Sequence, residues 1–341
     1  MKTLAIAAAG TGGHIIPAQT IAEKMKAQGW NILWFGGIQG LEHQLIPSQH
    51  PLKTLPMRGI RRHWSRYFRL PDQLLRSTLL AGYHLQRHRV SCVLVMGGYV
   101  TVPVGLAAKM TRIPILLHEQ NALAGQSNQI ISPWAAQRFT AFEDVLPDAT
   151  CIGNPIRSDI LKIGQTPYQP STPLKLLILG GSQGAQALNQ WGQITAKTPL
   201  AKRIEVLHMT GPEQHATIQN EYRRLKLNWK AVPYIQSIHE AYAFADLVIA
   251  RSGAMTVSEC IAAKRPAVWV PYPMAVDDHQ THNAQKVDQA SWIVQQPKMD
   301  NIASIIEVCL QKPDILKSKH SAIKAPMDAT EQLCQAIDTV G

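Results

Sequence analysis

Residues 2 to 29, KTLAIAAAGTGGHIIPAQTIAEKMKAQG, decide the fold. The apolar run LAIAAA leads into GTGGH, and apolar residues at helical spacing follow. Because the run ends in glycines and not in a cleavage site, we interpret it as a buried β-strand and not as a secretion signal. A strand, a glycine turn and a helix together form the repeating unit of α/β folds.

The same unit recurs along the chain. Further strand-like runs are NILWFGG, SCVLVMGG and PILLHEQ in the first half and LKLLILGG, RIEVLHMTG, DLVIARSG and PAVWVPYP in the second. Continuous apolar runs of this length are typical of parallel strands that are buried on both faces. With 341 residues, the chain is long enough for two such domains. The aperiodic stretch IGQTPYQPSTP, residues 163 to 173, predicts a linker or an extended start of the second domain.

The bulk composition limits the partners and the compartment. A formal net charge of +11 indicates an anionic partner, which can be nucleic acid, an anionic membrane surface or a phosphorylated small molecule. The five cysteines are scattered and form no CxxC pair, which argues against a zinc ribbon or a disulfide scaffold and favours reduced thiols. No apolar run approaches the ~20 residues that span a bilayer, so we expect any membrane contact to be peripheral.

Glycine-rich turns follow several of the predicted strands. GTGGH ends at His14, MGGY ends at Tyr99, and GGSQG ends at Gly184. Glycines let the backbone approach a diphosphate closely, and the amides at a helix start favour negative charge. Each motif alone is explained as well by an ordinary turn, with His14 as a helix cap. Together they indicate a ligand site flanked by phosphate-binding loops at the carboxyl ends of the strands.

A further candidate phosphate site follows the strand DLVIA. Arg251 to Glu259 read RSGAMTVSE, in which Ser252 or Gly253 can cap a helix and hydroxyl side chains follow in its first turns. Glu259 comes one turn later, where a carboxylate can accept hydrogen bonds from a vicinal diol such as ribose. The alternative is that Glu259 only complements the helix dipole.

A polar cluster, HEQN at His118 to Asn121, follows the strand PILL. Such a cluster at a strand end indicates a functional site, although a histidine there can equally be a structural one. The chain has no DxD motif and no metal-ligand spacing. We therefore expect no obligatory protein-bound metal and no cofactor.

The segment from Lys53 to Arg89 is unusually basic, with nine Lys and Arg residues against Asp72 alone. Aromatic and aliphatic residues lie among these charges, including Trp64, Tyr67, Phe68 and Leu74. A basic stretch with interfacial aromatics is typical of a patch that binds an anionic membrane surface. The alternative is a solvated face over ordinary core residues.

Seven motifs occur in the order GTGGH, MGGYV, LHEQN, IGNPIR, GGSQGA, RSGAMTVSE and HQTHNA. With this ordered set the chain resembles the MurG family of glycosyltransferases over nearly its whole length. The resemblance implies the α/β fold class of GT-B type, with two Rossmann-like parallel-sheet domains and an interdomain cleft. It places a lipid-acceptor and membrane domain at residues 1–160, a UDP-sugar donor domain at 161–326, and a C-terminal helix at 327–341 that packs back on the N-terminal domain.

The resemblance also implies the site residues. The residues expected to bind UDP-N-acetylglucosamine (UDP-GlcNAc) are Thr11, Gly12, Gly13, Asn121, Arg157, Ser182, Ile235, Arg251, Ala254, Met255, Thr256, Val257, Ser258, Glu259 and Gln280. Within this set Ser182 is implied as a phosphate contact, Ile235 with Arg251 as the lining of the uracil pocket, and Glu259 as the ribose acceptor. The residues expected at the acceptor diphosphate are Gly12, Gly13, His14, Gly97, Gly98 and Tyr99.

The implied activity is inverting transfer of N-acetylglucosamine from UDP-GlcNAc to the C4 hydroxyl of undecaprenyl-diphosphate-linked muramyl pentapeptide, at the cytoplasmic face of the bacterial inner membrane. We expect His14 to be the general base, because imidazole titrates near neutral pH, with Glu119 or His118 as alternatives. The expected partners are these two substrates and an anionic membrane surface, with other cell-wall synthesis proteins as further candidates and no nucleic acid. The rival functions are a related GT-B glycolipid transferase with a diacylglycerol acceptor, a UDP-sugar epimerase, and a basic binding module without catalysis.

Overall fold

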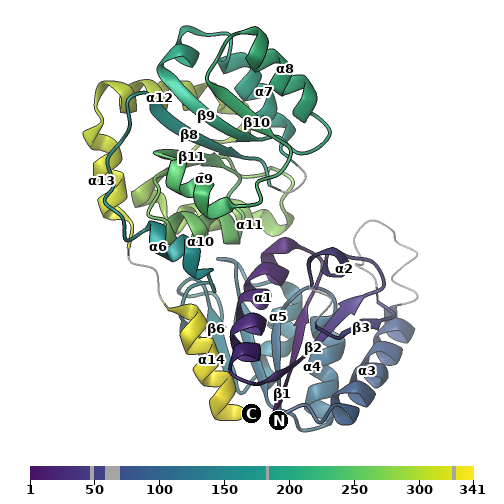
Figure 1. Cartoon of the computed structure of the whole chain (residues 1–341). Coiled ribbons are helices and arrows are strands. Elements are labelled where there is room, and N and C mark those ends of the chain that lie inside the picture. The colour runs from purple at the N-terminus through teal and green to yellow at the C-terminus, as the bar shows by residue number, and fades with distance from the viewer. Residues whose placement is uncertain (47–49, 58–69, 182–183, 325–327) are drawn as a thin grey trace. The chain divides into compact units, whose positions relative to one another are not determined.

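The computed structural model describes residues 1–46, 50–57, 70–181, 184–324 and 328–341. The chain divides into two compact units (Figure 1). Unit 1 comprises Met1–Ile156 and Met327–Gly341, and unit 2 comprises Arg157–Pro326. The chain passes from unit 1 to unit 2 before residues 163–173, the stretch at which the sequence suggests a linker.

Unit 1 is built on a seven-stranded sheet in the order β3-β2-β1-β4-β5-β6-β7. The strands are β1 (Thr3–Ala8), β2 (Asn31–Gly37), β3 (Leu52–Leu55), β4 (Cys92–Gly97), β5 (Ile115–Glu119), β6 (Gln137–Thr140) and β7 (Thr150–Cys151). Every neighbouring pair is parallel, and Ile6 of β1 lies opposite Trp34 of β2 and Leu94 of β4. The parallel strands predicted for this half are therefore confirmed.

Helices cover both faces of this sheet (Figure 1). They are α1 (Gly12–Ala27), α2 (Glu42–Leu45), α3 (Leu70–Arg87), α4 (Thr101–Met110), α5 (Gln126–Ile131) and α14 (Ala329–Val340), with a 3₁₀ turn at Ser132–Trp134. One core contains Ile6 and Trp34 and is closed by α1 and α14, while the other contains Ala7 and Phe35 and is closed by α3 and α4. Alternate residues of each strand thus fill opposite cores, which explains the continuous apolar runs.

The C-terminal helix α14 packs on α1 within unit 1. Lys24 of α1 pairs with Glu331, and Trp30 Nε1 donates to Asp338 Oδ1 over 2.9 Å. The side chain of Asp328 caps the helix by accepting from the amide of Glu331 at 3.1 Å. The predicted terminal helix is therefore present.

Unit 2 repeats the strand order of unit 1 in a six-stranded parallel sheet, β10-β9-β8-β11-β12-β13. Its strands are β8 (Leu174–Leu179), β9 (Ile204–Met209), β10 (Trp229–Val232), β11 (Leu247–Ala250), β12 (Ala267–Trp269) and β13 (Ser291–Ile293). This is the 3-2-1-4-5-6 order of Rossmann domains, in which ligands bind at the carboxyl ends of the strands where the order reverses. The reversal lies between β1 and β4 in unit 1 and between β8 and β11 in unit 2; we call these two places the switch points.

The helices of unit 2 flank its sheet (Figure 1). They are α6 (Ser158–Ile163), α7 (Gln186–Thr195), α8 (His215–Arg224), α9 (Ile238–Phe244), α10 (Ala254–Ala262), α11 (His279–Gln285), α12 (Asp300–Gln311) and α13 (Asp314–Ala322). Short 3₁₀ turns lie at Pro199–Arg203, Val276–Asp278, Asp288–Ala290 and Gln296–Lys298. Buried Asp246 accepts from the amides of Ser171 and Lys175 at 3.0 and 2.9 Å, which fixes the aperiodic stretch that enters β8.

Candidate functional site

The switch point of unit 1 brings together two of the predicted glycine loops. α1 begins at Gly12 after Thr11, whose backbone is extended, and the first amides of a helix have no acceptor inside it. Gly97 and Gly98 both have positive φ, and a Cβ on Gly98 would lie only 2.2 Å from the carbonyl oxygen of Ala9. Glycine is therefore required where the loop after β4 passes the end of β1, and the amides of Gly12 and Gly13 at the start of α1 are oriented to meet an anion beside it.

His14 lies in the first turn of α1, at this same switch point, and is partly buried. Its ring packs against Gly97, since a Cβ there would come within 3.0 Å of the ring atoms Cε1 and Nδ1. The structure therefore brings His14 together with the glycine pair that is expected to bind the acceptor diphosphate.

Tyr99 is held by a residue that the sequence analysis missed. Its hydroxyl lies 3.0 Å from Oε1 of Glu42, a fully buried residue of α2, and 3.0 Å from the carbonyl oxygen of Gln39. Glu42 and Tyr99 fill the space beside Gly36 and Gly37. A Cβ added to Gly36 would lie 2.8 Å from Cγ of Glu42, and a Cβ added to Gly37 would lie 2.4 Å from the Tyr99 ring. The glycine pair after β2 thus makes room for the chain's own side chains.

His118 is a fully buried structural histidine. Its Nε2 donates to the carbonyl oxygen of Gly153 at 2.9 Å, and Nε2 of Gln120 donates to its Nδ1 at 3.0 Å. Burial lowers the pKa of His118 to about 4, although the hydrogen bond to Gly153 opposes this shift. The ring therefore stays neutral near pH 7 and has both nitrogens occupied, which argues against His118 as the general base.

Glu119 organises the loop that follows β5. Its Oε1 accepts from the backbone amide and side-chain Nδ2 of Asn121 at 3.0 and 3.2 Å. Its Oε2 accepts from the amide of Gly125 at 2.9 Å and from Nδ2 of Asn128 at 2.8 Å. A carboxylate with four donors has little capacity to take a substrate proton, so this geometry favours a structural role for Glu119.

The switch point of unit 2 also carries two glycine-containing loops. Gly180 and Gly184 both lie in the loop after β8. A Cβ added to Gly180 would lie 2.4 Å from the amide nitrogen of Ala185, and a Cβ added to Gly184 would lie 2.3 Å from the carbonyl oxygen of Thr210. Ser182, the expected phosphate contact between them, lies outside the described residues. The tight packing of the two glycines fixes both ends of the loop.

The second of these loops leads from β11 into α10. Gly253 is the N-cap in extended backbone, so the expected phosphate contacts occupy the first turns of α10. They are Ala254, Met255, Thr256, Val257 and Ser258; Thr256 is partly exposed, and the other four are buried. Ser252 is fully buried, and no described group pairs with its Oγ. The backbone amides at the start of α10, and not these side chains, are thus the main groups that an anion would meet.

Glu259 is in the second turn of α10 and is partly buried. The Tyr242 hydroxyl donates to its Oε2 at 3.0 Å, and within the described residues its Oε1 accepts no hydrogen bond. Burial raises the pKa of Glu259 to about 7, while the Tyr242 hydrogen bond and the charge of Arg157 act in the opposite direction. A carboxylate with one unoccupied oxygen can accept hydrogen bonds from a ligand, as the ribose hypothesis requires.

Arg251 and Gln280 hold the loop after β12. The Arg251 guanidinium donates to the carbonyl oxygens of Val270 and Pro271 at 2.9 and 3.0 Å and to Oε1 of Gln296 at 2.7 Å. Oε1 of Gln280 accepts from the amide of Tyr272 at 3.0 Å. Both residues therefore shape one loop beside the start of α10.

Ile235 and Arg157 belong to two other segments of unit 2, and the charge of Arg157 reaches Glu259. Ile235 follows β10, and β9 and β8 separate that edge strand from β11, the strand that precedes Arg251. Arg157 is the N-cap of α6, with its Nε 4.0 Å from Oδ1 of Asp159. Ile235 and Arg251, the two residues expected to line a uracil pocket, therefore follow strands that are not neighbours in the sheet.

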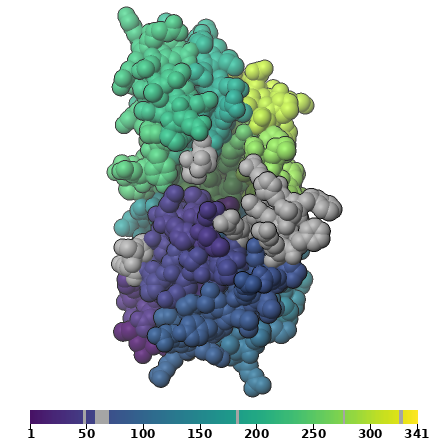
Figure 2. Space-filling model, turned by 90° about the vertical axis from the view of Figure 1, so that its right-hand side faces the viewer, coloured from purple at the N-terminus to yellow at the C-terminus, as the bar shows by residue number. Residues whose placement is uncertain are grey.

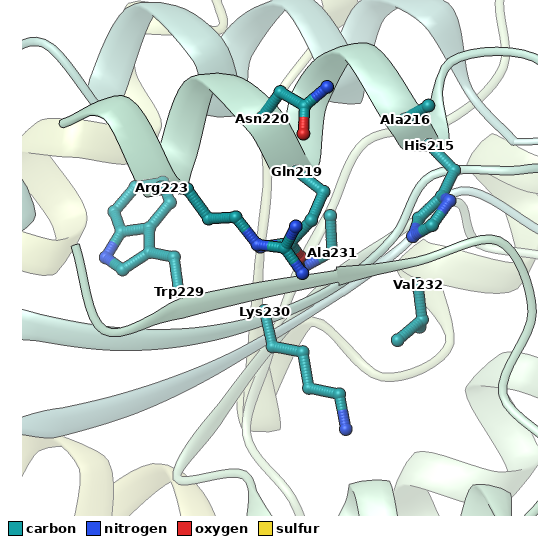
Figure 3. Close-up of a pocket in the computed structure, with 9 residues that line it drawn as sticks. All are labelled: His215, Ala216, Gln219, Asn220, Arg223, Trp229, Lys230, Ala231 and Val232. Atoms are coloured by element: carbon teal, nitrogen blue, oxygen red, sulfur yellow. The ribbon is translucent and has the colours of Figure 1, made fainter. Parts of the chain in front are cut away.

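Two open pockets are lined by residues other than those expected for the site. A cavity of about 490 Å³ opens between α8 and the edge strand β10, and Figure 3 shows His215, Arg223 and Lys230 around it. A second cavity, of about 370 Å³, lies at the amino ends of β1 and β2 and includes Lys26 and His50. Neither contains a residue that the sequence predicts for the site. Among the residues of known placement, no three His, Cys, Asp or Glu side chains are grouped to hold a metal ion.

Comparisons with known proteins agree over the full chain. The N-terminal domain of glycosyltransferase family 28 matches residues 4–140, and its C-terminal domain matches residues 175–333. A UDP-N-acetylglucosamine–N-acetylmuramyl-(pentapeptide) pyrophosphoryl-undecaprenol N-acetylglucosamine transferase of Tolumonas auensis is 38% identical over 98% of this chain and 99% of its own.

Solved structures give the same result. The crystal structure of MurG from Acinetobacter baumannii has a TM-score of 0.82 and 31% identity over 99% of this chain and 100% of that chain. A UDP-GlcNAc 2-epimerase from Neisseria meningitidis, with a TM-score of 0.66 and 14% identity over the whole of both chains, is similar in fold alone. These comparisons confirm the expected α/β fold of GT-B type and the expected glycosyltransferase activity. The chain belongs to glycosyltransferase family 28.

Proposed function

We propose that this enzyme transfers N-acetylglucosamine from UDP-GlcNAc to the C4 hydroxyl of undecaprenyl-diphosphate-linked N-acetylmuramyl pentapeptide, with inversion at the anomeric carbon. The observation that carries the proposal is the full-length similarity, at 38% identity, to a transferase named for this donor and acceptor. The phosphate-compatible helix starts at both switch points support it, because both substrates carry a diphosphate.

Unit 2 is the proposed donor side. The first turns of α10 bind the diphosphate through backbone amides, and Glu259 accepts hydrogen bonds from the ribose hydroxyls one turn later. Arg251 and Gln280 shape the loop after β12 that borders the nucleotide. Ser182 and Arg157 are further proposed donor contacts, and Ile235 remains the proposed contact to the base.

Unit 1 is the proposed acceptor side. The amides of Gly12 and Gly13 and the glycine pair Gly97 and Gly98 bind the lipid diphosphate, with Tyr99 beside them. Thr11 and Asn121 are the proposed contacts of this unit to the donor sugar. His14 is the general base, since its ring lies at the same strand ends and an imidazole can accept a proton near neutral pH.

The proposed reaction is a single displacement. The acceptor hydroxyl forms a bond to the anomeric carbon and passes its proton to His14, while the bond from that carbon to the UDP oxygen breaks. The transition state has oxocarbenium character, and negative charge accumulates on the departing diphosphate. Fixed amides and the dipole at the start of α10 stabilise that charge without reorganising during the reaction.

A membrane-binding surface on unit 1 fits the lipid acceptor. Among the described residues no helix has both the length and the apolar character needed to span a bilayer. On α3, however, Leu75, Leu79 and Tyr83 repeat every four residues and are 60%, 57% and 55% exposed. Figure 2 looks onto the side of unit 1 where α3, in blue, reaches the surface. We call these three residues the α3 stripe.

The α3 stripe is suited to shallow insertion at the cytoplasmic face of the inner membrane. Exposed Arg76 and Arg87 lie on the same helix and can meet anionic headgroups. The aromatic and basic residues predicted for this role between Arg58 and Arg69 lie outside the described residues. The stripe lies within the segment Lys53 to Arg89, for which the sequence predicts a membrane-binding patch.

The decisive experiment incubates the purified protein with UDP-GlcNAc and a water-soluble, short-chain form of the muramyl lipid. Mass spectrometry is expected to show one added N-acetylhexosamine, and nuclear magnetic resonance a β-linkage to C4. Parallel reactions contain diacylglycerol or no acceptor. A product with diacylglycerol only, or conversion of UDP-GlcNAc into its epimer without acceptor, would replace the proposal by one of its rivals.

A matched pair of arginine variants tests the location of the donor site. Arg251→Gln removes the guanidinium that holds the loop after β12, so we expect a higher donor KM. Arg223→Gln makes the same change at the cavity between α8 and β10 (Figure 3) and is expected to leave donor KM unchanged. The reverse result would place the donor in that cavity.

A further inference from the structure

Glu42 is a buried carboxylate at the carboxyl end of β2. Its side chain is fully inaccessible to solvent, and within the described residues no Lys, Arg or His forms an ion pair with it. A carboxylate can be buried in this way only if hydrogen bonds replace its lost hydration. Three donors do so here: the amide of Gly37 and the Tyr99 hydroxyl reach Oε1 at 2.8 and 3.0 Å, and the amide of Gly10 reaches Oε2 at 3.3 Å.

These three donors come from three different loops. Gly37 ends β2, Gly10 follows β1, and Tyr99 follows β4, so one side chain joins the carboxyl ends of three neighbouring strands. Burial and the charge of Glu42 raise the pKa of Tyr99, which keeps its hydroxyl protonated as a donor. A single carboxylate thus ties together the switch point of unit 1.

The surrounding glycines leave room only for Glu42. A Cβ added to Gly40 would lie 2.2 Å from Oε2 of Glu42, and a Cβ added to Gly36 would lie 2.8 Å from Cγ of Glu42. The backbone therefore encloses the carboxylate closely, and the three hydrogen bonds have little freedom to rearrange. A group that is fixed so tightly is suited to hold other groups in place before a substrate binds.

We infer that Glu42 is a positioning residue that fixes the turn at Gly10–Gly13 and the ring of Tyr99 for the acceptor diphosphate. The inference rests on the proposed function of unit 1 as the acceptor side. Gly10 directly precedes Thr11, the N-cap of α1, and His14 follows in the first turn of that helix. A displacement of Gly10 therefore shifts the phosphate-binding amides and the general base together, and a misplacement of about 1 Å can cost about 10²-fold in rate.

The test is Glu42→Gln, which keeps the size of the side chain. A glutamine has one oxygen acceptor, so its amide N–H₂ must face either the Gly10 amide or the pair formed by Gly37 and Tyr99. We expect kcat/KM for the short-chain acceptor to fall on the order of 10- to 100-fold. The affinity for UDP, which binds to unit 2 in the proposed function, is expected to stay within about twofold, well below that loss.

Asp246→Asn is the matched control. Asp246 is also a buried carboxylate that accepts from two backbone amides, but it fixes the start of β8 in unit 2. We expect this variant to lower the melting temperature without changing kcat/KM for the acceptor. If it lowers kcat/KM as much as Glu42→Gln does, or if Glu42→Gln has the kinetics of wild type, the positioning role is overturned.

Hydrogen exchange separates this inference from the proposed function. In Glu42→Gln, the amides of Gly10 or Gly37 are expected to exchange faster than in wild type, whether or not the protein transfers a sugar. Unchanged exchange at both amides contradicts the inference, whereas absence of transfer by wild type contradicts only the proposed function. If Glu42→Gln does not fold, Tyr99→Phe removes one of the three donors together with the hydroxyl's contact to the carbonyl oxygen of Gln39. Wild-type kcat/KM for the acceptor in that variant overturns the role.

Discussion

The two units have the same strand order around their switch points and differ in how the carboxylates at nearby strand ends and helices are satisfied. In unit 1, Glu119 accepts four hydrogen bonds and Glu42 three, all from the chain itself. In unit 2, Glu259 accepts one, from Tyr242, and burial raises its pKa to about 7. The chain therefore uses Glu42 and Glu119 of unit 1 to fix loops and leaves Glu259 of unit 2 with capacity for a ligand.

This difference shows why topology alone does not assign roles. Both sheets place loops and helix starts where an α/β fold binds ligands, yet the side chains at those ends have different remaining hydrogen-bonding capacity. Removal of a carboxylate whose oxygens are all hydrogen-bonded within the chain is expected to disturb the local structure. Removal of one that still has an oxygen without such a bond is expected to weaken ligand binding.

The largest effect is expected for His14→Ala. The ring packs on Gly97 without being part of either buried core, so the fold should persist. Loss of a general base costs about 10²- to 10⁴-fold in kcat. Steady-state kinetics and a thermal melt measure the two quantities. A kcat within about twofold of wild type at every pH, far below that loss, would rule out His14 as the base.

Glu259→Ala is expected to have the next largest effect, and on the donor alone. Hydrogen bonds to a charged acceptor contribute about 1.5–3 kcal/mol each, so kcat/KM for UDP-GlcNAc should fall roughly 10- to 100-fold. The KM for the acceptor should stay nearly unchanged, because Glu259 belongs to unit 2. Kinetics with each substrate varied in turn measure both values, and equal donor kinetics in variant and wild type would remove Glu259 from the ribose site.

The long apolar runs made the strands predictable from sequence. Each of the eight runs forms a parallel strand. Such a run can be recognised without knowing its neighbours in the sheet, because a strand that is buried on both faces is apolar throughout. β3, β6, β7, β10 and β13 were not predicted, since each is short and only partly buried and so carries no continuous apolar run. The order of strands in each sheet was also beyond the sequence analysis, because pairing depends on contacts between distant segments.

The site was predictable in its loops and not in its buried support. GTGGH, MGGY and RSGAMTVSE carry local signals, and the structure places each at a switch point. Glu42 carries none, because its partners Gly10 and Tyr99 are 32 and 57 residues away. The three glycines at 36, 37 and 40 were the available signal, since they are the positions where its side chain excludes a Cβ. The saturation of Glu119 likewise depends on distances that sequence does not give.

A smaller effect on transfer is expected from the α3 stripe. Leu75→Ser with Leu79→Ser removes two exposed apolar side chains, each of which gains about 1.5–3 kcal/mol when it is fully buried. Because insertion is shallow, we expect about tenfold weaker binding to anionic vesicles and slower transfer to vesicle-embedded acceptor. Transfer to the short-chain acceptor should stay normal.

The control for the α3 stripe comes from unit 2. Ile194 of α7 is 63% exposed and apolar, so Ile194→Ser removes comparable surface from the donor side. Vesicle sedimentation at low salt compares the two variants. Binding that falls equally in both would mean that exposed apolar surface acts without regard to its position.

The smallest effect concerns pH and Glu259, which accepts one hydrogen bond from the chain. Burial raises the pKa of Glu259 from 4.5 to about 7, so its ionised form accepts ribose hydroxyls above pH 7 and the neutral form prevails below it. Since the neutral form keeps one acceptor oxygen, we expect UDP affinity to fall only about threefold from pH 8 to pH 6.

The raised pKa of Glu259 also makes the stability of the fold depend on pH. The contribution of the neutral Glu259 side chain to the free energy of unfolding is complete below pH 4.5 and is lost as the pH rises through 7, because the folded state then has to bury an ionised group. Glu259→Gln should therefore bind UDP more weakly at pH 8, lose part of the pH dependence and melt at a higher temperature than wild type above pH 7. Calorimetric titrations of both proteins at pH 6 and 8 separate this effect from titration of the UDP phosphate, which is common to both. Identical pH dependence in the two proteins would show that Glu259 does not titrate in this range.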